Sequence, residues 1–93
     1  MDVLELLKAH GAEIKERFAV KRIGVFGSHA RGEQKATSDI DILVEFETPT
    51  YENFISLIYF LEDLTGKTVD LVTSRGLSPY LRSAVTEEVI WCE

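Results

Sequence analysis

Apolar residues recur at steps of three and four along the first part of the chain, and this spacing predicts an amphipathic helix over residues 2–18. A glycine lies within the apolar stripe, although glycine costs a helix about 1 kcal/mol relative to alanine. We therefore expect close packing of the backbone at Gly11. The stripe is formed by Val3, Leu4, Leu7, Gly11, Ile14 and Phe18.

Short runs of apolar and β-branched residues predict strands over residues 22–26, 39–46 and 68–73. Residues 89–92 are expected to form a short fourth strand at the end of the chain. Between the first two runs, a glycine-bracketed turn over residues 27–32 is followed by a polar loop.

Two more helices have clear signals at their ends. A helix over residues 51–65 is preceded by Thr50, a suitable N-cap, and followed by Gly66, which suits a left-handed residue after a helix. A last helix over residues 79–88 begins with a proline after Ser78, a common N-cap.

The helix over residues 51–65 is apolar around most of its circumference, because Ile55, Tyr59 and Phe60 extend its main stripe onto a second flank. A helix of this kind is buried on more than one side. The second flank is covered either by a partner chain or, within this chain, by the last helix or Trp91. The sequence leaves both possibilities open.

This order of elements predicts one α/β domain of the α+β type over residues 1–93, with a small mixed sheet of three to four strands flanked by helices. An apolar share of 45% and a charged share of 28% exclude a disordered or collagen-like chain. A single cysteine, Cys92, excludes a disulfide framework and a four-cysteine zinc site. With no apolar run long enough for a membrane and no signal peptide, we expect a cytoplasmic protein without a membrane partner.

The net charge of −6 argues against direct binding to nucleic acid, which requires a basic face. Charge is unevenly distributed, since residues 14–35 contain six basic and two acidic residues, whereas residues 36–66 contain seven acidic and no basic ones. A phosphate site beside a metal site would need such a division, although a short chain also produces it by chance.

Two carboxylates begin the second predicted strand. Side chains alternate along a strand, so Asp39 and Asp41 point to one face, with their Cα atoms roughly 6.5 Å apart. Two oxygen ligands at that spacing suit Mg²⁺ or Mn²⁺. A third acid, Asp70, lies in the next strand and joins them if the two strands are neighbours, as sequential strands are in about two-thirds of cases. The alternative is a solvated strand edge or a pair of turn caps.

The turn after the first strand has the features of a phosphate site. Glycine at position 27 allows a ligand to approach the backbone amides, the Ser28 hydroxyl can donate a hydrogen bond, and Arg31 can neutralise phosphate charge. His29 lies beside this turn, where a lone histidine is usually solvated, and we assign it no chemistry.

Gly27-Ser28, ten intervening residues and Asp39-x-Asp41 resemble the signature of the nucleotidyltransferase superfamily related to DNA polymerase β, and the whole chain is similar to its minimal branch, the MNT domains. The resemblance implies the nucleotidyltransferase fold and transfer of AMP from ATP to an acceptor hydroxyl. It implies that Asp39, Asp41 and Asp70 are catalytic and bind two Mg²⁺ ions. Gly27 and Ser28 would hold the triphosphate, together with Arg31.

The resemblance also implies a partner and a biological role. Minimal domains of this type pair with a HEPN toxin, add AMP to one of its tyrosines and so act as its antitoxin in a hetero-oligomer. Two alternatives remain open at this point: an antitoxin that neutralises its partner by binding with little catalysis, and an enzyme that modifies a small-molecule hydroxyl.

Overall fold

Four strands form one mixed sheet in the order β3-β2-β1-β4 in the computed structural model, which describes residues 2–92. They span Val20–Phe26 (β1), Ile40–Phe46 (β2), Val69–Thr73 (β3) and Ile90–Trp91 (β4). The β1–β2 and β1–β4 pairs are antiparallel and the β2–β3 pair is parallel. The predicted mixed sheet is therefore confirmed, and only the two end residues of the predicted domain lie outside the described part.

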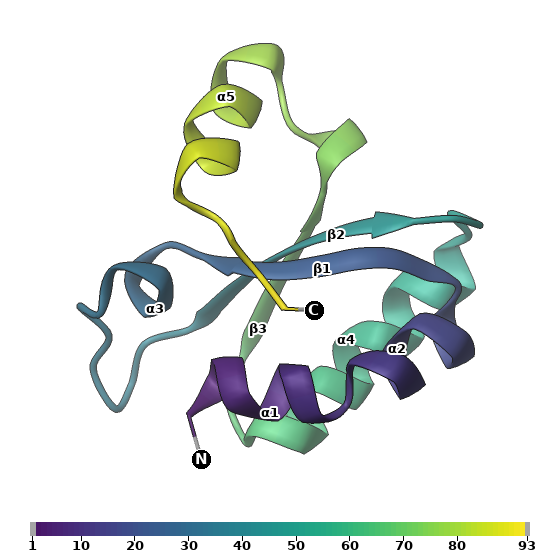
Figure 1. The fold of residues 1–93 in the computed structure, drawn as a ribbon, viewed down its shortest axis with the longest axis horizontal. Coiled ribbons are helices and arrows are strands. Elements are labelled where there is room, and N and C mark those ends of the chain that lie inside the picture. Colours follow the sequence, from purple (N-terminus) through teal and green to yellow (C-terminus); the bar gives the residue numbers. More distant parts are fainter. Residues whose placement is uncertain (1, 93) are drawn as a thin grey trace.

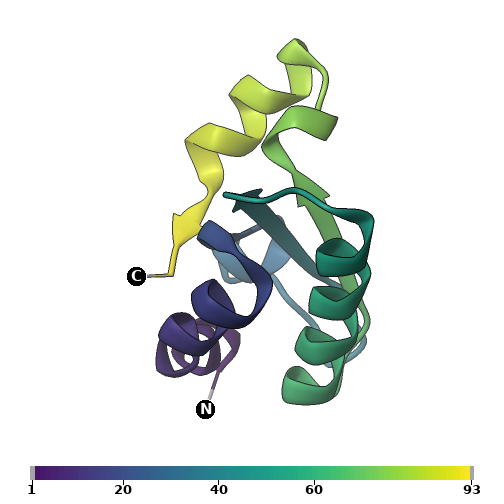
Figure 2. The same cartoon turned by 90° about the vertical axis from the view of Figure 1, so that its right-hand side faces the viewer.

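Three helices cover one face of the sheet: α1 (Val3–Ala9), α2 (Gly11–Phe18) and α4 (Tyr51–Thr65). Figures 1 and 2 show them side by side below the strands. The core lies between these helices and the sheet, because alternate strand residues point toward the helices. Its fully buried members include Leu7, Ile14, Ile23, Val25, Ile40, Ile42, Val44, Leu57 and Leu61.

The helix predicted over residues 2–18 is wrong in one respect, since it is broken at His10. The backbone of this residue has φ −107° and ψ 11°, and its ring Nδ1 lies 3.0 Å from the Leu6 carbonyl oxygen. The predicted close packing at Gly11 is also wrong, because a Cβ atom placed there would meet nothing within 4 Å. Glycine at this position is the first residue of α2, directly after the break.

The predicted ends of the other two helices are confirmed. Thr50 Oγ1 accepts a hydrogen bond of 3.0 Å from the Asn53 backbone N–H at the start of α4, and Gly66 ends that helix with φ 69°. Ser78 Oγ accepts one of 3.3 Å from the Leu81 N–H at the start of α5 (Pro79–Glu88).

Strand boundaries differ slightly from the prediction. β1 begins at Val20, two residues early, because Ala19 adopts a left-handed conformation with φ 54° that turns the chain from α2 directly into the strand. β2 begins at Ile40, so Asp39 lies just outside it, and β3 begins at Val69. Two short helices, α3 (Ser28–Arg31) and η1 (Ser74–Gly76), follow the ends of β1 and β3.

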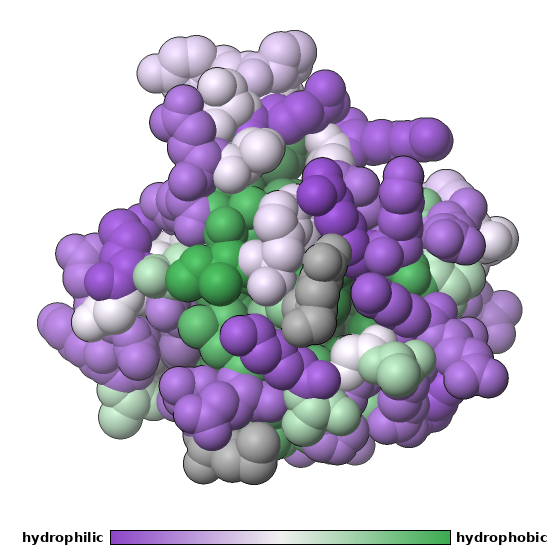
Figure 3. All heavy atoms as spheres, in the orientation of Figure 1, coloured by the Kyte–Doolittle hydropathy of each residue, from purple (hydrophilic) through white to green (hydrophobic). Residues whose placement is uncertain are grey.

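The fifth helix, α5, lies on the opposite side of the sheet from α1, α2 and α4 and projects away from it (Figure 1). None of its residues is buried, and Tyr80 is 86% exposed. In the space-filling view, hydrophobic residues gather between α5 and the lower helices (Figure 3). Among the described residues, no helix combines the length and apolar composition needed to cross a membrane.

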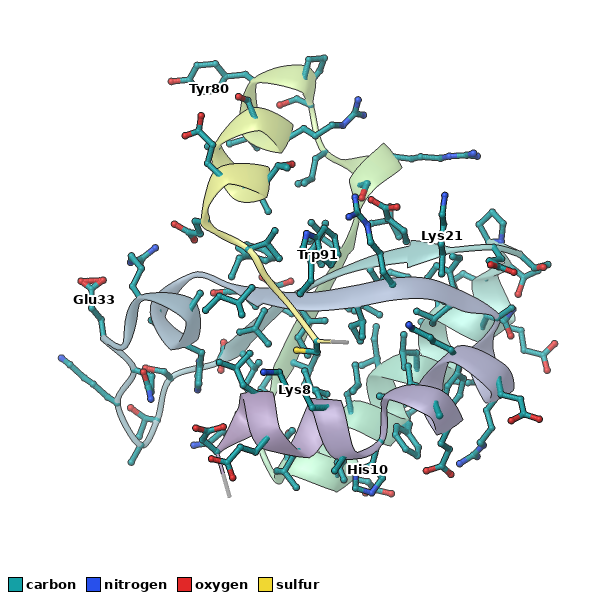
Figure 4. All side chains as sticks on the ribbon, in the orientation of Figure 1. Lys8, His10, Lys21, Glu33, Tyr80 and Trp91 are labelled. Carbon is teal, nitrogen blue, oxygen red and sulfur yellow. The ribbon has the colours of Figure 1, made fainter. Side chains whose placement is uncertain are left out.

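The second flank of α4 is not covered by the last helix or by Trp91, so that alternative is wrong. Both lie on the other side of the sheet from α4 (Figures 1 and 4). Instead the Phe60 ring packs against Phe18 of α2, with ring centroids 5.3 Å apart. Tyr59, next to it, remains 68% exposed.

Candidate active site

Asp41 and Asp70 are direct neighbours across the parallel β2–β3 pair. Their side chains lie on the sheet face that carries α5, because the residues flanking them, such as Ile42 and Leu71, are buried on the other face. Neighbouring strands are about 4.8 Å apart, so the two carboxylates lie close together. Asp39, two residues before Asp41, adds a third carboxylate just before the strand. The predicted adjacency of the two strands is confirmed.

Negative charge accumulates at this position. Partial burial raises the pKa of the Asp41 carboxyl, and the charges of Asp70 and Asp39 raise it further. Each of these effects disfavours the ionised form of Asp41, so a cation at this place would relieve the repulsion.

The carboxylates do not form a complete metal site by themselves. Within residues 2–92, no three acidic, histidine or cysteine side chains converge closely enough to hold a metal ion. Mg²⁺ usually takes one or two protein carboxylates and completes its coordination with water and substrate phosphate oxygens. Neighbouring Asp41 and Asp70, with their all-oxygen donors, fit that mode of binding.

The turn after β1 is in direct contact with Asp41 of this acidic pair. Phe26, the last residue of β1, pairs with Asp41, and Gly27 follows with φ 72° and ψ −150°. A Cβ atom at position 27 would overlap the Asp41 carboxylate. Glycine is therefore required both by the backbone conformation and by the approach of Asp41. The predicted phosphate turn and the predicted metal ligands thus meet at one end of the sheet.

Glu88, a residue that the sequence analysis missed, completes this end of the sheet. It is the last residue of α5, and its Oε1 accepts a hydrogen bond of 2.6 Å from the Gly27 backbone N–H. Its two carboxylate oxygens also accept from Arg31 Nη1 at 3.2 and 3.1 Å. Hydrogen bonds to Glu33 and Glu88 raise the pKa of the Arg31 guanidinium. In this structure, two of the donors predicted to hold phosphate, the Gly27 N–H and the Arg31 guanidinium, bind carboxylate groups instead.

His29 does not have the solvated surroundings that we expected. Both of its ring nitrogens are buried and have no hydrogen-bond partner among the described residues. Its positive charge, where present, lowers the pKa of Asp41, so the ring lies near that carboxylate. The short helix α3 turns the residue inward, which the sequence did not indicate.

A groove of about 390 Å³ lies at the other end of the same face, lined by residues that include Lys21, Ser74, Arg75 and Arg82. It begins near Glu45, roughly 13 Å along β2 from Asp41 at about 3.3 Å per residue. Lys21 and Trp91 both project from the sheet on the α5 side, whereas Glu33 marks the opposite, turn-bearing end (Figure 4). The groove is therefore separate from the acidic pair but open to the same face.

Between the acidic pair and the groove, the Arg22 side chain packs on the surface of the sheet. Arg22 Nη2 lies 2.9 Å from Glu45 Oε2, and its guanidinium carbon lies 3.8 Å from the centroid of the Trp91 ring. The hydrogen bond from Arg22 lowers the pKa of Glu45, and a bond of 3.1 Å from the Ser74 hydroxyl adds to this effect.

Comparisons with known proteins agree on one family. The sequence profile called nucleotidyltransferase domain matches residues 7–92. A Thermococcus cleftensis protein named protein adenylyltransferase MntA is 46% identical over 91 residues, which cover 97% of this chain and 92% of that protein. A solved structure provisionally described as a minimal nucleotidyltransferase is 44% identical with a TM-score of 0.79, and the match covers 97% of this chain and 95% of the other.

A more distant likeness includes a bound nucleotide analogue. The crystal structure of a toxin-antitoxin with AMP-PNP contains a chain that is 26% identical to this one, with a TM-score of 0.75. That match covers 92% of this chain and 72% of the other. The structural likenesses confirm the predicted fold class.

Proposed function

This chain belongs to the nucleotidyltransferase domain family, and from that membership we propose that it transfers AMP from ATP to a tyrosine hydroxyl of a HEPN toxin, for which it acts as antitoxin. Its single domain, residues 1–93, performs the transfer with two Mg²⁺ ions. The protein and its toxin form a hetero-oligomer.

The relatives support both the reaction and the partner. The Thermococcus cleftensis protein, with 46% identity, is named a protein adenylyltransferase. The toxin-antitoxin crystal structure contains AMP-PNP, an analogue of the proposed substrate. Another structure of the same fold is described as a tri-AMPylated HEPN toxin of Shewanella oneidensis in complex with an MNT antitoxin.

One observation supports the reaction most directly: Asp41 pairs with Asp70 across β2–β3 and also contacts the Gly27 turn. A nucleotidyl transfer needs a cation site and a phosphate site within the length of a triphosphate. The register of two strand pairs, β1–β2 and β2–β3, brings both predicted sites to the same end of the sheet.

Each residue has a task in the reaction. The Gly27 N–H, the Ser28 hydroxyl and the Arg31 guanidinium bind the triphosphate. Asp41 and Asp70, with Asp39 from the segment before β2, would share the binding of Mg²⁺ with water and phosphate oxygens. The ion would supply positive charge that neutralises phosphate and lowers the pKa of an attacking hydroxyl. Asp70 accepts the proton of the acceptor hydroxyl. The acceptor oxygen forms a bond to the α-phosphorus, and the bond to the leaving pyrophosphate breaks.

The test is an adenylylation assay with the purified chain, a HEPN protein, Mg²⁺ and labelled ATP. We expect label on the HEPN protein with the wild-type chain. In the variant Asp39→Ala/Asp41→Ala, labelling should fall at least about 100-fold, the lower range for loss of one electrostatic group that stabilises a transition state. Asp63→Ala is the matched control, because this exposed acid lies on α4, on the other side of the sheet.

Three outcomes separate the candidate functions. Label that disappears in the Asp39→Ala/Asp41→Ala variant but not in Asp63→Ala supports the proposal. If the Asp39→Ala/Asp41→Ala variant transfers no label but still suppresses the toxin fully, the chain is an antitoxin that acts by binding. No label on the protein, with ATP consumed only when a small hydroxyl compound is present, would indicate a small-molecule enzyme.

A further inference from the structure

Glu88 binds the same two groups that the proposed function assigns to the triphosphate. Its carboxylate accepts the Gly27 N–H at 2.6 Å and lies 3.1 Å from Arg31 Nη1. We propose that Glu88 occupies the phosphate turn of the free protein as a carboxylate in place of phosphate, so that ATP binds only after Glu88 has been displaced. This inference rests on the proposed function and adds to it an acid that competes with the substrate.

The position of Glu88 follows from the pairing of β4 with β1. Trp91 pairs with Gly24 and Ile90 with Val25 in antiparallel register. Glu88 precedes Ile90 by two residues and Gly27 follows Val25 by two, so this pairing brings the end of α5 near the turn, where the Glu88 carboxylate reaches the Gly27 backbone N–H. The sheet therefore brings the end of α5 to the Gly27 turn, and the Glu88 side chain makes the contact there.

Carboxylate and phosphate compete for these donors. The Gly27 N–H is a single donor, and a hydrogen bond of 2.6 Å leaves no space for a phosphate oxygen beside it. Arg31 is also partly engaged, since its Nε donates to Glu33 and its Nη1 donates to Glu88. A phosphate that approached with Glu88 in place would meet negative charge from Glu88 and from the adjacent Asp41.

Displacement of Glu88 disturbs little of the fold. No residue of α5 is buried, so swinging the Glu88 side chain out of the turn exposes little apolar surface. The other side-chain hydrogen bonds of α5 that leave the helix run from Arg82 to the carbonyl oxygens of Ser74 and Leu77, in the segment directly before the helix. Glu88 can therefore leave the turn while the core between the sheet and α1, α2 and α4 stays intact.

A supporting role for Glu88 in the phosphate turn would predict the opposite change in ATP affinity. If Glu88 served to hold Arg31 and the Gly27 turn in shape for the substrate, its removal would weaken ATP binding. If it competes with phosphate, removal strengthens binding, and only for ligands that carry a phosphate tail.

The experiment measures ATP affinity by calorimetry in Mg²⁺ for the wild-type chain, Glu88→Ala, Glu88→Gln and the control Glu87→Gln. Glu87 is the exposed neighbour in sequence. We expect Glu88→Ala to bind ATP roughly tenfold more tightly, the order of effect for one charge-assisted hydrogen bond. Glu88→Gln keeps the size and one acceptor oxygen but loses the charge, so a smaller gain is expected. Tripolyphosphate should show the same gains, adenosine none, and Glu87→Gln should match wild type.

The results distinguish this inference from the proposed function. The competition is overturned if both Glu88 variants melt like wild type and bind ATP no more tightly than wild type. The proposed function would survive that result as long as the wild-type chain labels its partner. Equal gains for adenosine and ATP would also overturn it, because the effect would not depend on phosphate. If no variant binds ATP with Mg²⁺, including Glu88→Ala, both the competition and the proposed function are wrong.

Discussion

Gly27→Ala tests the contact that joins the two halves of the site. Gly27 has φ 72° and ψ −150°, a region that residues with a side chain enter only with strain of about 1–3 kcal/mol. The new Cβ would also overlap the Asp41 carboxylate. Rotating that side chain away from its preferred rotamer adds about 0.5–1.5 kcal/mol. We therefore expect the free energy of unfolding to fall by about 2–4 kcal/mol.

Gly32→Ala is the matched control. Its φ is also 72°, but its ψ is 21°, and a Cβ there would meet nothing within 4 Å. The left-handed region alone costs a residue with a side chain about 1–2 kcal/mol. Urea unfolding followed by circular dichroism gives both losses, and Gly27→Ala should be the more damaging of the two.

A double-mutant cycle isolates the part that is due to Asp41. In Gly27→Ala/Asp41→Ala the overlapping carboxylate is absent, so the combined loss should be smaller than the two single losses added together, by about 0.5–1.5 kcal/mol. Equal losses in the two glycine variants, together with simple additivity in the cycle, would refute the contact between the turn and Asp41.

Two further predictions concern groups outside the turn. Glu45→Gln should lower the free energy of unfolding at pH 7 by about 0.5 kcal/mol, a value suited to a partly exposed pair. Because Arg22 lowers the pKa of Glu45 from 4.5, this contribution is present above pH 4.5 and is lost as the pH falls through the lower native value. Urea unfolding at pH 7 and in strong acid checks this, and a difference that persists in acid contradicts it. Cys92 is 0% exposed, and burial raises its pKa to about 11. Its thiol should react with a disulfide reagent only in denaturant, and rapid stoichiometric reaction of the native protein would show that it is accessible.

The elements that were predicted well are those with local signals. Thr50 and Gly66 define α4 through contacts within four residues, and Ser78 does the same for α5. The break at His10 escaped prediction because the apolar spacing continues through it, from Leu7 to Ile14, without interruption. The spacing of apolar residues indicates which side of a helix is buried, and the buried residues of α1 and α2 fall on one continuous stripe.

No local sequence pattern predicts that Asp41 and Asp70 are neighbours in the sheet. Alternation along β2 places Asp41 on the face opposite Ile40 and Ile42, but it does not identify the neighbouring strand. That Asp70 is the neighbour followed from an assumption about sequential strands, which the parallel register of β2 and β3 confirms.

The contact of Glu88 with the Gly27 turn could not be predicted from the sequence. A strand over residues 89–92 was predicted, yet its partner was not, and without the register of Ile90 against Val25 an acid at the end of a helix is only a surface residue. Once that pairing is known, the end of α5 is expected near Gly27, and Glu88 does contact it although the two residues are 61 apart in sequence. The motif identifies the groups that hold a triphosphate, whereas the last strand determines what those groups bind before a triphosphate arrives. A buried N–H needs a partner in either state, and Glu88 supplies it in the free protein.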